Sequence, residues 1–200
     1  MMNFPNQKNN IAQGCSNEIS NIAEIFETTN AKFIEEERLL FDSEVSERTL
    51  CSSLSQFLHD AIKITKYKDY YVDVEYNRNQ ANSENRHIKT IVNEQEKIVS
   101  ITCDLIIHSR GTIAEQDNSL ALEMKKSTRP LKEKLKNRDR LIALTKTSYD
   151  DIWSFDGISL PEHVCGYLLG VYYEINFAKR DIRIEYYIDG CKVCDKKIQY

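Results

Sequence analysis

The chain has 200 residues, which is enough for one domain with a sizeable core and hardly enough for two. Its 41% hydrophobic and 29% charged residues are typical of a globular protein and argue against a disordered chain. The net charge of −4 does not point to nucleic acid as a partner, although a cluster of catalytic carboxylates would itself make a nuclease more acidic.

The sequence has no run of 18 apolar residues, so we expect neither a transmembrane helix nor a membrane partner. Residues 1–13 are polar and lack the apolar core of a secretory signal. We therefore expect a cytoplasmic protein with reduced cysteines, of which Cys51 and Cys103 are buried free thiols. Cys191 and Cys194 form a lone C-x2-C pair without two further ligands, so we expect no zinc site there.

The N-terminal part of the chain is expected to be helical. Helix-spaced apolar residues predict a helix over 17–41, inside an N-terminal segment that spans residues 1–42. Asp42 and Ser43 can cap a second helix, which opens the main domain at residues 43–200. We expect the two parts to form one compact domain.

The hydrophobic period then changes to two, which indicates strands. The expected strands are 70–77, 98–108, 119–126, 164–177 and 181–188. Residues 79–96 are interpreted as a polar loop or hairpin excursion, and 148–163 as a second loop. A helix over 131–147 separates the third strand from the fourth. This order predicts an α/β fold, in which a mixed central sheet of about five strands has helices on both sides.

Three polar side chains interrupt two of the apolar strands. Asp104 lies within ITCDLIIH, whereas Glu123 and Lys125 lie within LALEMKKS. Glu123 and Lys125 are two residues apart and therefore point to the same face of their strand. If the two strands are neighbours, Asp104 and Glu123 can bind one divalent cation with Lys125 beside it. Such a site suits phosphodiester hydrolysis, because Mg²⁺ prefers oxygen ligands and keeps several waters.

The pattern D-x18-E-x-K, on two strands that follow a helix, resembles the PD-(D/E)XK nuclease superfamily with its restriction-endonuclease-like fold. The core order of that family is αβββαβ, and the elements expected over residues 43–176 follow it. The resemblance implies that Asp104 and Glu123 bind Mg²⁺, or Mn²⁺ as its substitute, and that Lys125 is the catalytic lysine. The sequence departs from the family at Cys103, where the family pattern has proline.

The resemblance also implies site residues outside these three. The family often carries a glutamate on its first core helix, and Glu47 matches it because it shares a helix face with Leu50 and Leu54. Glu44 is the weaker alternative. The blocks VDVEYNR, CDLIIHSRG and NSLALEMKKS are similar to a set of uncharacterised bacterial proteins with this signature. Within that similarity, the second-tier candidates are Glu75, Arg78, His108 and Arg110.

A basic segment follows the second of these strands, with eight basic and two acidic residues between Lys125 and Arg140. The candidates for contact with a nucleic-acid backbone are Lys126, Lys132, Lys136 and Arg140. The last three are four residues apart and are expected to line one helical face beside the metal site. The expected partner is nucleic acid, with DNA favoured, while a homodimer or a partner subunit stays open.

Other interpretations of these residues stay open as well. Asp104 can be an ordinary strand-end aspartate, Glu123 and Lys125 a solvent-facing pair, and Glu47 a first-turn acid that stabilises its helix. Against this, apolar neighbours favour strands covered on both faces, where an unpaired charge is costly. We expect a metal-dependent nuclease, an Mg²⁺-dependent hydrolase. The alternatives are a catalytically silent nucleic-acid-binding or regulatory module and an interaction component of a larger assembly.

Overall fold

The computed structural model describes residues 16–76, 102–147 and 165–200, together with the backbone of four short strands. These strands form two separate hairpins, β2 with β3 and β4 with β5, and their bounds are Arg78–Ala81, Asn85–Ile88, Thr90–Val92 and Ile98–Ser100. They fall within and beside the range predicted as a polar loop or hairpin excursion. The second predicted loop, 148–163, lies outside the described residues.

The helices lie in the first two described segments. Their bounds are α1 Asn17–Glu36, α2 Arg38–Asp42, α3 Glu47–Ile62, η1 Ala114–Gln116 and α4 Leu131–Thr145. The predicted cap at Asp42 or Ser43 is wrong. The helix α3 begins at Glu47, because the Ser46 hydroxyl accepts a hydrogen bond from the Thr49 N–H at 3.1 Å and so caps the first turn. None of the helices described is long and apolar enough to cross a membrane.

A six-stranded sheet forms the centre of the molecule, in the order β1-β6-β7-β8-β9-β10. The strand bounds are Tyr71–Val74, Leu105–His108, Asn118–Lys126, Leu169–Asn176, Asp181–Ile188 and Cys191–Gln199. The pair β7–β8 is parallel and the other neighbours are antiparallel, so the sheet is mixed. The predicted α/β class is confirmed, but the prediction of about five strands missed β10.

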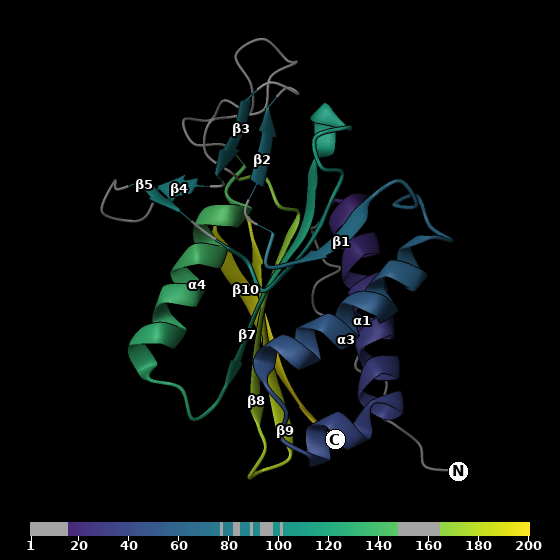
Figure 1. Ribbon diagram of the computed structural model, residues 1–200, viewed down its shortest axis with the longest axis vertical. Coiled ribbons are helices and arrows are strands. Elements are labelled where there is room, and N and C mark those ends of the chain that lie inside the picture. Colours follow the sequence, from purple (N-terminus) through teal and green to yellow (C-terminus); the bar gives the residue numbers. More distant parts are fainter. Residues whose placement is uncertain are drawn as a thin grey trace.

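Helices cover both faces of this sheet (Figure 1): α1 and α3 lie on one side and α4 on the other. We call these sides the α1/α3 face and the α4 face. The α1/α3 face holds the main core, which includes Phe26 of α1, Leu54 of α3 and Leu122 of β7. Because α1 contributes to this core, the N-terminal helix packs as part of the same structural unit as the sheet.

Successive side chains of β7 point alternately to the two faces of the sheet. Leu122 and Met124 belong to the core of the α1/α3 face, whereas Ala121 belongs to a smaller cluster under α4. The side chains of Glu123 and Lys125 therefore lie on the α4 side. The expected burial of Cys51 and Cys103 is confirmed, with one cysteine on each side of the sheet.

Gly170 of β8 lies where α4 packs most closely on the sheet. A Cβ atom at this position would stand 2.9 Å from Cγ2 of Thr145 and 3.1 Å from Cβ of Tyr187. Such distances are too short for carbon atoms in contact, so the absence of a side chain here lets the end of α4 approach the strands.

Candidate active site

The antiparallel pairing of β6 and β7 brings the three predicted catalytic residues together. Leu105 pairs with Leu122, so Asp104, just before β6, lies beside the Glu123–Met124 segment. Oδ2 of Asp104 accepts hydrogen bonds from the backbone N–H of Met124 at 2.8 Å and from Nζ of Lys125 at 3.2 Å. The predicted strand 98–108 is interrupted at this point, because Asp104 lies outside β6 and bonds β7 through its side chain.

Glu123 is completely buried, and its two carboxylate oxygens have different surroundings. Oε1 accepts a hydrogen bond from Nη1 of Arg140 at 2.6 Å. Oε2 is buried and has no hydrogen-bond partner among the described residues. Burial, and then the negative charge of Asp104, raise the pKa of Glu123 to about 7, although Arg140 acts in the opposite direction.

Each carboxylate has one oxygen that accepts no hydrogen bond from the described residues. Both hydrogen bonds of Asp104, whose side chain is 26% exposed, go to Oδ2, and that of Glu123 goes to Oε1. Of the two remaining oxygens, Oε2 of Glu123 is the buried one. A buried oxygen without a donor is costly, and a divalent cation would remove that cost. The donor set fits Mg²⁺, which prefers carboxylate oxygens.

The carboxylate pair is a small donor set. The described residues include no group of three or more His, Cys, Asp or Glu side chains that could hold a metal ion. Two carboxylates can nevertheless suffice for Mg²⁺, because this ion keeps several of its waters and completes its shell with substrate phosphate.

Glu47 reaches the sheet from the first turn of α3, as its helix face predicted. Its Oε1 accepts hydrogen bonds from the backbone N–H of Lys126 at 2.8 Å and from Nε of Arg129 at 3.0 Å, while Oε2 accepts one from Arg129. Burial alone would raise the pKa of Glu47, but the Arg129 and Lys126 hydrogen bonds and the charge of Lys125 hold it below its usual value. Glu47 is thus close to Lys125 but is occupied by Arg129.

The basic side chains of α4 divide between sheet and solvent, which differs from the predicted strip. Lys132 and Lys136 are exposed. Arg140 is only 16% exposed and turns inward to Glu123. The 40° advance per four residues of an α-helix carries position 140 away from the face of position 132.

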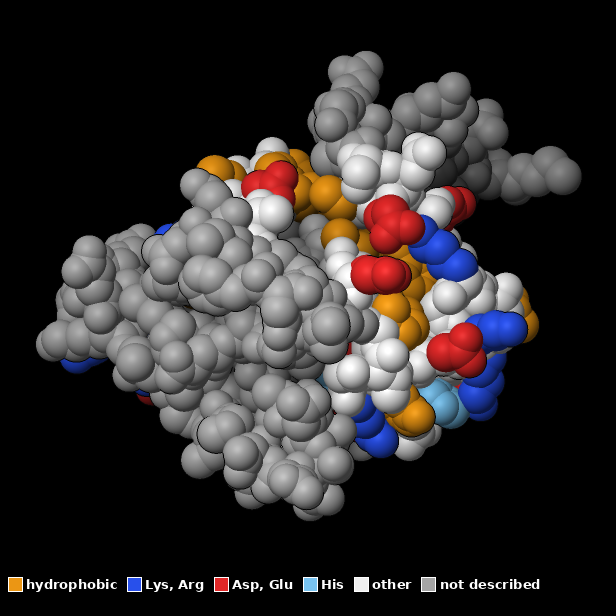
Figure 2. Space-filling view, turned by 90° about the horizontal axis from the view of Figure 1, so that it is seen from above, with side chains coloured by type: hydrophobic (Ala, Val, Ile, Leu, Met, Phe, Trp, Pro, Cys, Tyr) orange, Lys and Arg blue, Asp and Glu red, His pale blue; other side chains and the backbone are white. Residues whose placement is uncertain are grey.

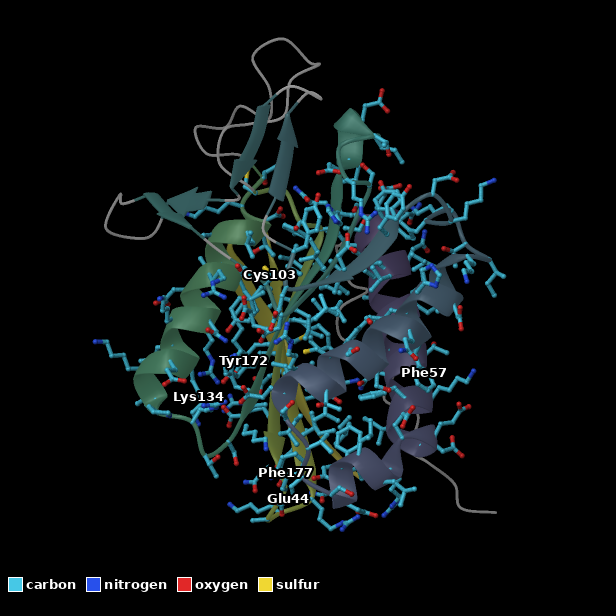
Figure 3. The ribbon with its side chains drawn as sticks, in the orientation of Figure 1. Glu44, Phe57, Cys103, Lys134, Tyr172 and Phe177 are labelled. Carbon is cyan, nitrogen blue, oxygen red and sulfur yellow. The ribbon has the colours of Figure 1, made fainter. Side chains whose placement is uncertain are left out.

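Two more basic residues of α4 pair with acidic residues of the sheet. Nζ of Lys134, which Figure 3 labels, lies 3.3 Å from Glu174. Arg138 donates two hydrogen bonds to Glu185 at 2.8 and 3.0 Å. The guanidinium of Arg138 also stacks on the ring of Tyr172, with 4.0 Å between its Cζ atom and the ring centroid. These ion pairs fix the register of α4 on β8 and β9.

Lys126 lies apart from the other predicted backbone contacts. Its Nζ atom donates to the carbonyl oxygen of Glu44 at 2.9 Å and lies 5.0 Å from the centroid of Phe177. Figure 3 shows Glu44 and Phe177 at the end of the sheet where β8 turns into β9. Lys126 therefore lies next to α3, on the opposite side of the sheet from Lys132.

His108 and Arg110 meet around an aspartate that sequence reasoning did not select. Nε2 of His108 lies 2.9 Å from Oδ2 of Asp73, and Arg110 donates to both oxygens of the same carboxylate at 2.8 and 2.5 Å. Burial would raise the pKa of Asp73, but hydrogen bonds from His108 and Arg110 outweigh it and hold this pKa far below its usual range. The pairing Tyr71↔His108 across β1 and β6 creates this cluster at the far end of β6 from Asp104.

Glu75, another second-tier candidate, forms an ion pair with Arg48 of α3 at 2.8 Å and is 42% exposed. Its backbone N–H donates to the carbonyl oxygen of Asp104 at 3.3 Å, so Glu75 adjoins the site through its main chain. The side chain of Arg78 lies outside the described residues.

Charges of both signs meet at the end of the molecule seen from above. Figure 2 shows acidic and basic side chains beside one another on the coloured part of this end, without one large patch of a single sign. This mixture agrees with the small net charge of the whole chain.

The sequence did not predict which residues bind the side chains of the site. Arg140 binds Glu123, Arg129 binds Glu47 and Asp73 binds His108. For Arg140 and Arg129 one signal was available, since a buried carboxylate needs a cation and α4 and the turn before it are rich in arginine. For Asp73 the available signal was its position on a strand, β1, where an acidic side chain interrupts the apolar residues Val72 and Val74.

Comparison with models of protein families, with curated proteins and with solved structures gave no match. A function for this chain therefore has to be inferred from its own residues.

Proposed function

We propose that this chain is a metal-dependent nuclease that hydrolyses phosphodiester bonds of nucleic acid, with DNA as the favoured substrate. The observation that carries the proposal is the pair of carboxylates, Asp104 and Glu123, each with one unpartnered oxygen and with Lys125 beside them. The order α3, β1, β6, β7, α4, β8 adds support, because it is the order that the resemblance to the PD-(D/E)XK superfamily implies.

Each residue has a distinct role in this proposal. Asp104 and Glu123 would hold Mg²⁺, or Mn²⁺ in its place, through Oδ1 and Oε2. A bound ion of this kind polarises a phosphoryl oxygen and acidifies a water molecule. Lys125 is 15% exposed and keeps its ammonium group beside Asp104, where it can orient the attacking water or stabilise the charge that develops on the phosphate.

The reaction consumes only water and substrate. The oxygen of the water forms a bond to phosphorus while the phosphoester bond to the leaving oxygen breaks, and the proton lost by the water balances the one gained by that oxygen. Glu47 and Arg129 would stabilise the end of β7 next to Lys125. Lys132 and Lys136 on the outer side of α4 would hold the phosphate backbone without reading its sequence.

A cleavage assay tests this function directly. End-labelled double-stranded DNA, single-stranded DNA and structured RNA are incubated with the wild type in Mg²⁺ or Mn²⁺, and in EDTA. We expect metal-dependent cleavage that falls by at least about 100-fold in Glu123→Gln and in Lys125→Ala, since each change removes a group aimed at the reacting phosphate. Glu35→Gln, an equivalent change at an exposed position of α1, serves as the matched control and should cleave like the wild type. Cleavage that survives EDTA, or that persists in both variants, would contradict the proposal.

One observation favours the catalytically silent alternative. Arg140 already neutralises Glu123 in this structure, as it would in a domain that keeps the fold without turnover. This alternative expects nucleic-acid binding that is independent of metal, is unaffected by Lys125→Ala and is not followed by cleavage. A stable oligomer that retains no nucleic acid would instead favour an interaction component.

A further inference from the structure

Arg140 connects α4 to the carboxylate that is buried most deeply in the candidate site. Its Nη1 atom lies 2.6 Å from Oε1 of Glu123 and also donates to the carbonyl oxygen of Thr102 at 3.2 Å. The side chain of Arg140 is 16% exposed and that of Glu123 is fully buried. The guanidinium is therefore held by two acceptors, one on β7 and one in the segment that leads to Asp104.

The helix that carries Arg140 is itself held in place on the sheet. Arg138 makes a two-point contact with Glu185 of β9, and Lys134 contacts Glu174 of β8. These anchors precede Arg140 by about half a turn and by nearly two turns of helix. The backbone of α4 beneath Arg140 is thus held on the sheet by ion pairs that do not involve the carboxylates of the site.

The contact of Arg140 with Glu123 is one-sided. It occupies Oε1 only, and Oε2 stays buried without a donor among the described residues. A guanidinium that replaced a metal ion would be expected to face both carboxylates, yet the hydrogen bonds of Asp104 come from Met124 and Lys125. The geometry instead divides the Glu123 carboxylate into one oxygen bound by the protein and one that is free.

We propose that Arg140 is a positioning residue of the metal site, which holds Oε1 of Glu123 so that Oε2 is presented to a divalent cation together with Asp104. The inference rests on the proposed function, because it assumes that these carboxylates bind the ion.

Metal binding can be measured without substrate. The probe is Mn²⁺ alone, titrated into the folded full chain and followed by calorimetry or by the electron-spin resonance signal of the free ion. The variants are Arg140→Met, which keeps a long side chain without charge, and Arg140→Lys, which keeps the charge without the planar guanidinium. Arg38→Met, at an exposed position of α2, is the matched control.

We expect one Mn²⁺ per chain in the wild type and in Arg38→Met. In Arg140→Met the dissociation constant should rise by about 10- to 100-fold at an unchanged stoichiometry, as happens when a residue that orients a metal ligand is lost. Arg140→Lys should fall between the two. The stoichiometry separates this role from a merely structural one, because partial unfolding lowers the number of sites and leaves the dissociation constant of the remaining sites unchanged.

Two results would overturn the inference while leaving the proposed function intact: Mn²⁺ binding in Arg140→Met that equals the wild type, or binding that is tighter. Tighter binding would mean that the guanidinium competes with the ion. A different failure, in which neither the wild type nor Arg38→Met binds Mn²⁺, would remove the metal site itself and the proposed function with it.

Discussion

The two faces of the sheet differ in how far charged side chains take part in their packing. On the α1/α3 face, aromatic and aliphatic residues of two helices pack on the strands, with Phe26, Leu54 and Leu122 fully buried. On the α4 face, a smaller apolar cluster is joined by ion pairs between helix and sheet, of which Arg140 with Glu123 and Arg138 with Glu185 are the most buried. Adjacent residues of one strand, β7, serve both faces.

This difference indicates that one face mainly stabilises the fold and the other mainly positions charged groups. Burial of apolar surface is the main source of folding free energy, so the α1/α3 face can supply most of the stability. Buried charges contribute little net stability, because desolvation offsets their attraction. A sheet that accepts this cost on one face, close to Asp104 and Lys125, is better explained by a need for charged groups than by a need for stability.

The largest expected effect comes from the apolar face. Leu54→Ala should lower the free energy of unfolding by about 2–5 kcal/mol, because it opens a cavity beneath α3. Leu135→Ala, at a 48% exposed position of α4, should change it by less than about 0.5 kcal/mol. Urea denaturation measures both. Equal effects of the two changes on the free energy of unfolding would contradict the conclusion that the α1/α3 face supplies most of the stability.

The second expected effect is a dependence of stability on pH that comes from Glu123. Its pKa of about 7 in the folded protein lies above the ordinary value of 4.5, so the folded state favours the protonated carboxyl. The stabilisation that the protonated Glu123 gives to the folded state is therefore complete below pH 4.5, and it is lost as the pH rises to about 7. The shift in pKa between the unfolded and folded states corresponds to about 3 kcal/mol in the free energy of unfolding.

Urea denaturation in EDTA at several pH values between 4.5 and 7 measures this contribution. The wild type should lose stability over the range relative to Glu123→Gln, which has no titrating group at that position. Two parallel pH profiles would show that Glu123 is not perturbed as its burial implies.

A smaller effect is expected from the ion pair between α4 and β9. Arg138→Met should cost about 2–3 kcal/mol, because Glu185 is only 3% exposed and loses two charge-assisted hydrogen bonds. The double change Arg138→Met with Glu185→Leu should recover part of that loss, since the buried Glu185 carboxylate is then removed as well. Arg38→Met is the exposed control. A double variant that is less stable than the single one would mean that these charges stabilise the fold outright.

The smallest effect concerns nucleic-acid affinity. Replacing Lys132 and Lys136 with alanine should weaken binding uniformly across sequences, and it should reduce the slope of log affinity against log salt by about 0.9 for each lysine that contacts a phosphate. The matched control replaces two exposed lysines on the α1/α3 side, Lys32 of α1 and Lys63 just after α3. An equal loss in both double variants would indicate general electrostatic attraction and no binding surface on α4.

Most of the fold follows from the distribution of apolar residues, because the helices α1 and α3 each bury an apolar stripe and the central strands β6, β7 and β8 are apolar and buried on both faces. The strand β10 was not predicted, because it lacks such an apolar pattern. Its sequence CKVCDKKIQ has few apolar residues, since it is an edge strand with a charged outer face and an irregular register between Lys192 and Cys194. Nothing in its local pattern reveals the partner strand β9 that gives it order.

The part of the site that lies on or next to the neighbouring strands β6 and β7 could be predicted from the sequence. Alternation places Glu123 and Lys125 on one face, and the pairing of β6 with β7 brings Asp104 to them. The orientation of Arg140 was not predictable, because helical spacing alone groups it with Lys132. It turns inward because the buried Glu123 charge attracts it, and that burial depends on how α4 lies across the whole sheet.

The glycine at position 170 sets the distance between helix and strands on which that arrangement depends. Thr145 of α4 rests directly over its backbone, and Leu141, the neighbour of Arg140, lies 3.5 Å from the point where a Cβ would stand. An added methyl group would force Thr145 or the helix that carries it to shift. The same helix carries Arg140 to Glu123, so the spacing at Gly170 contributes to the arrangement of the candidate site from a strand that holds none of its catalytic groups.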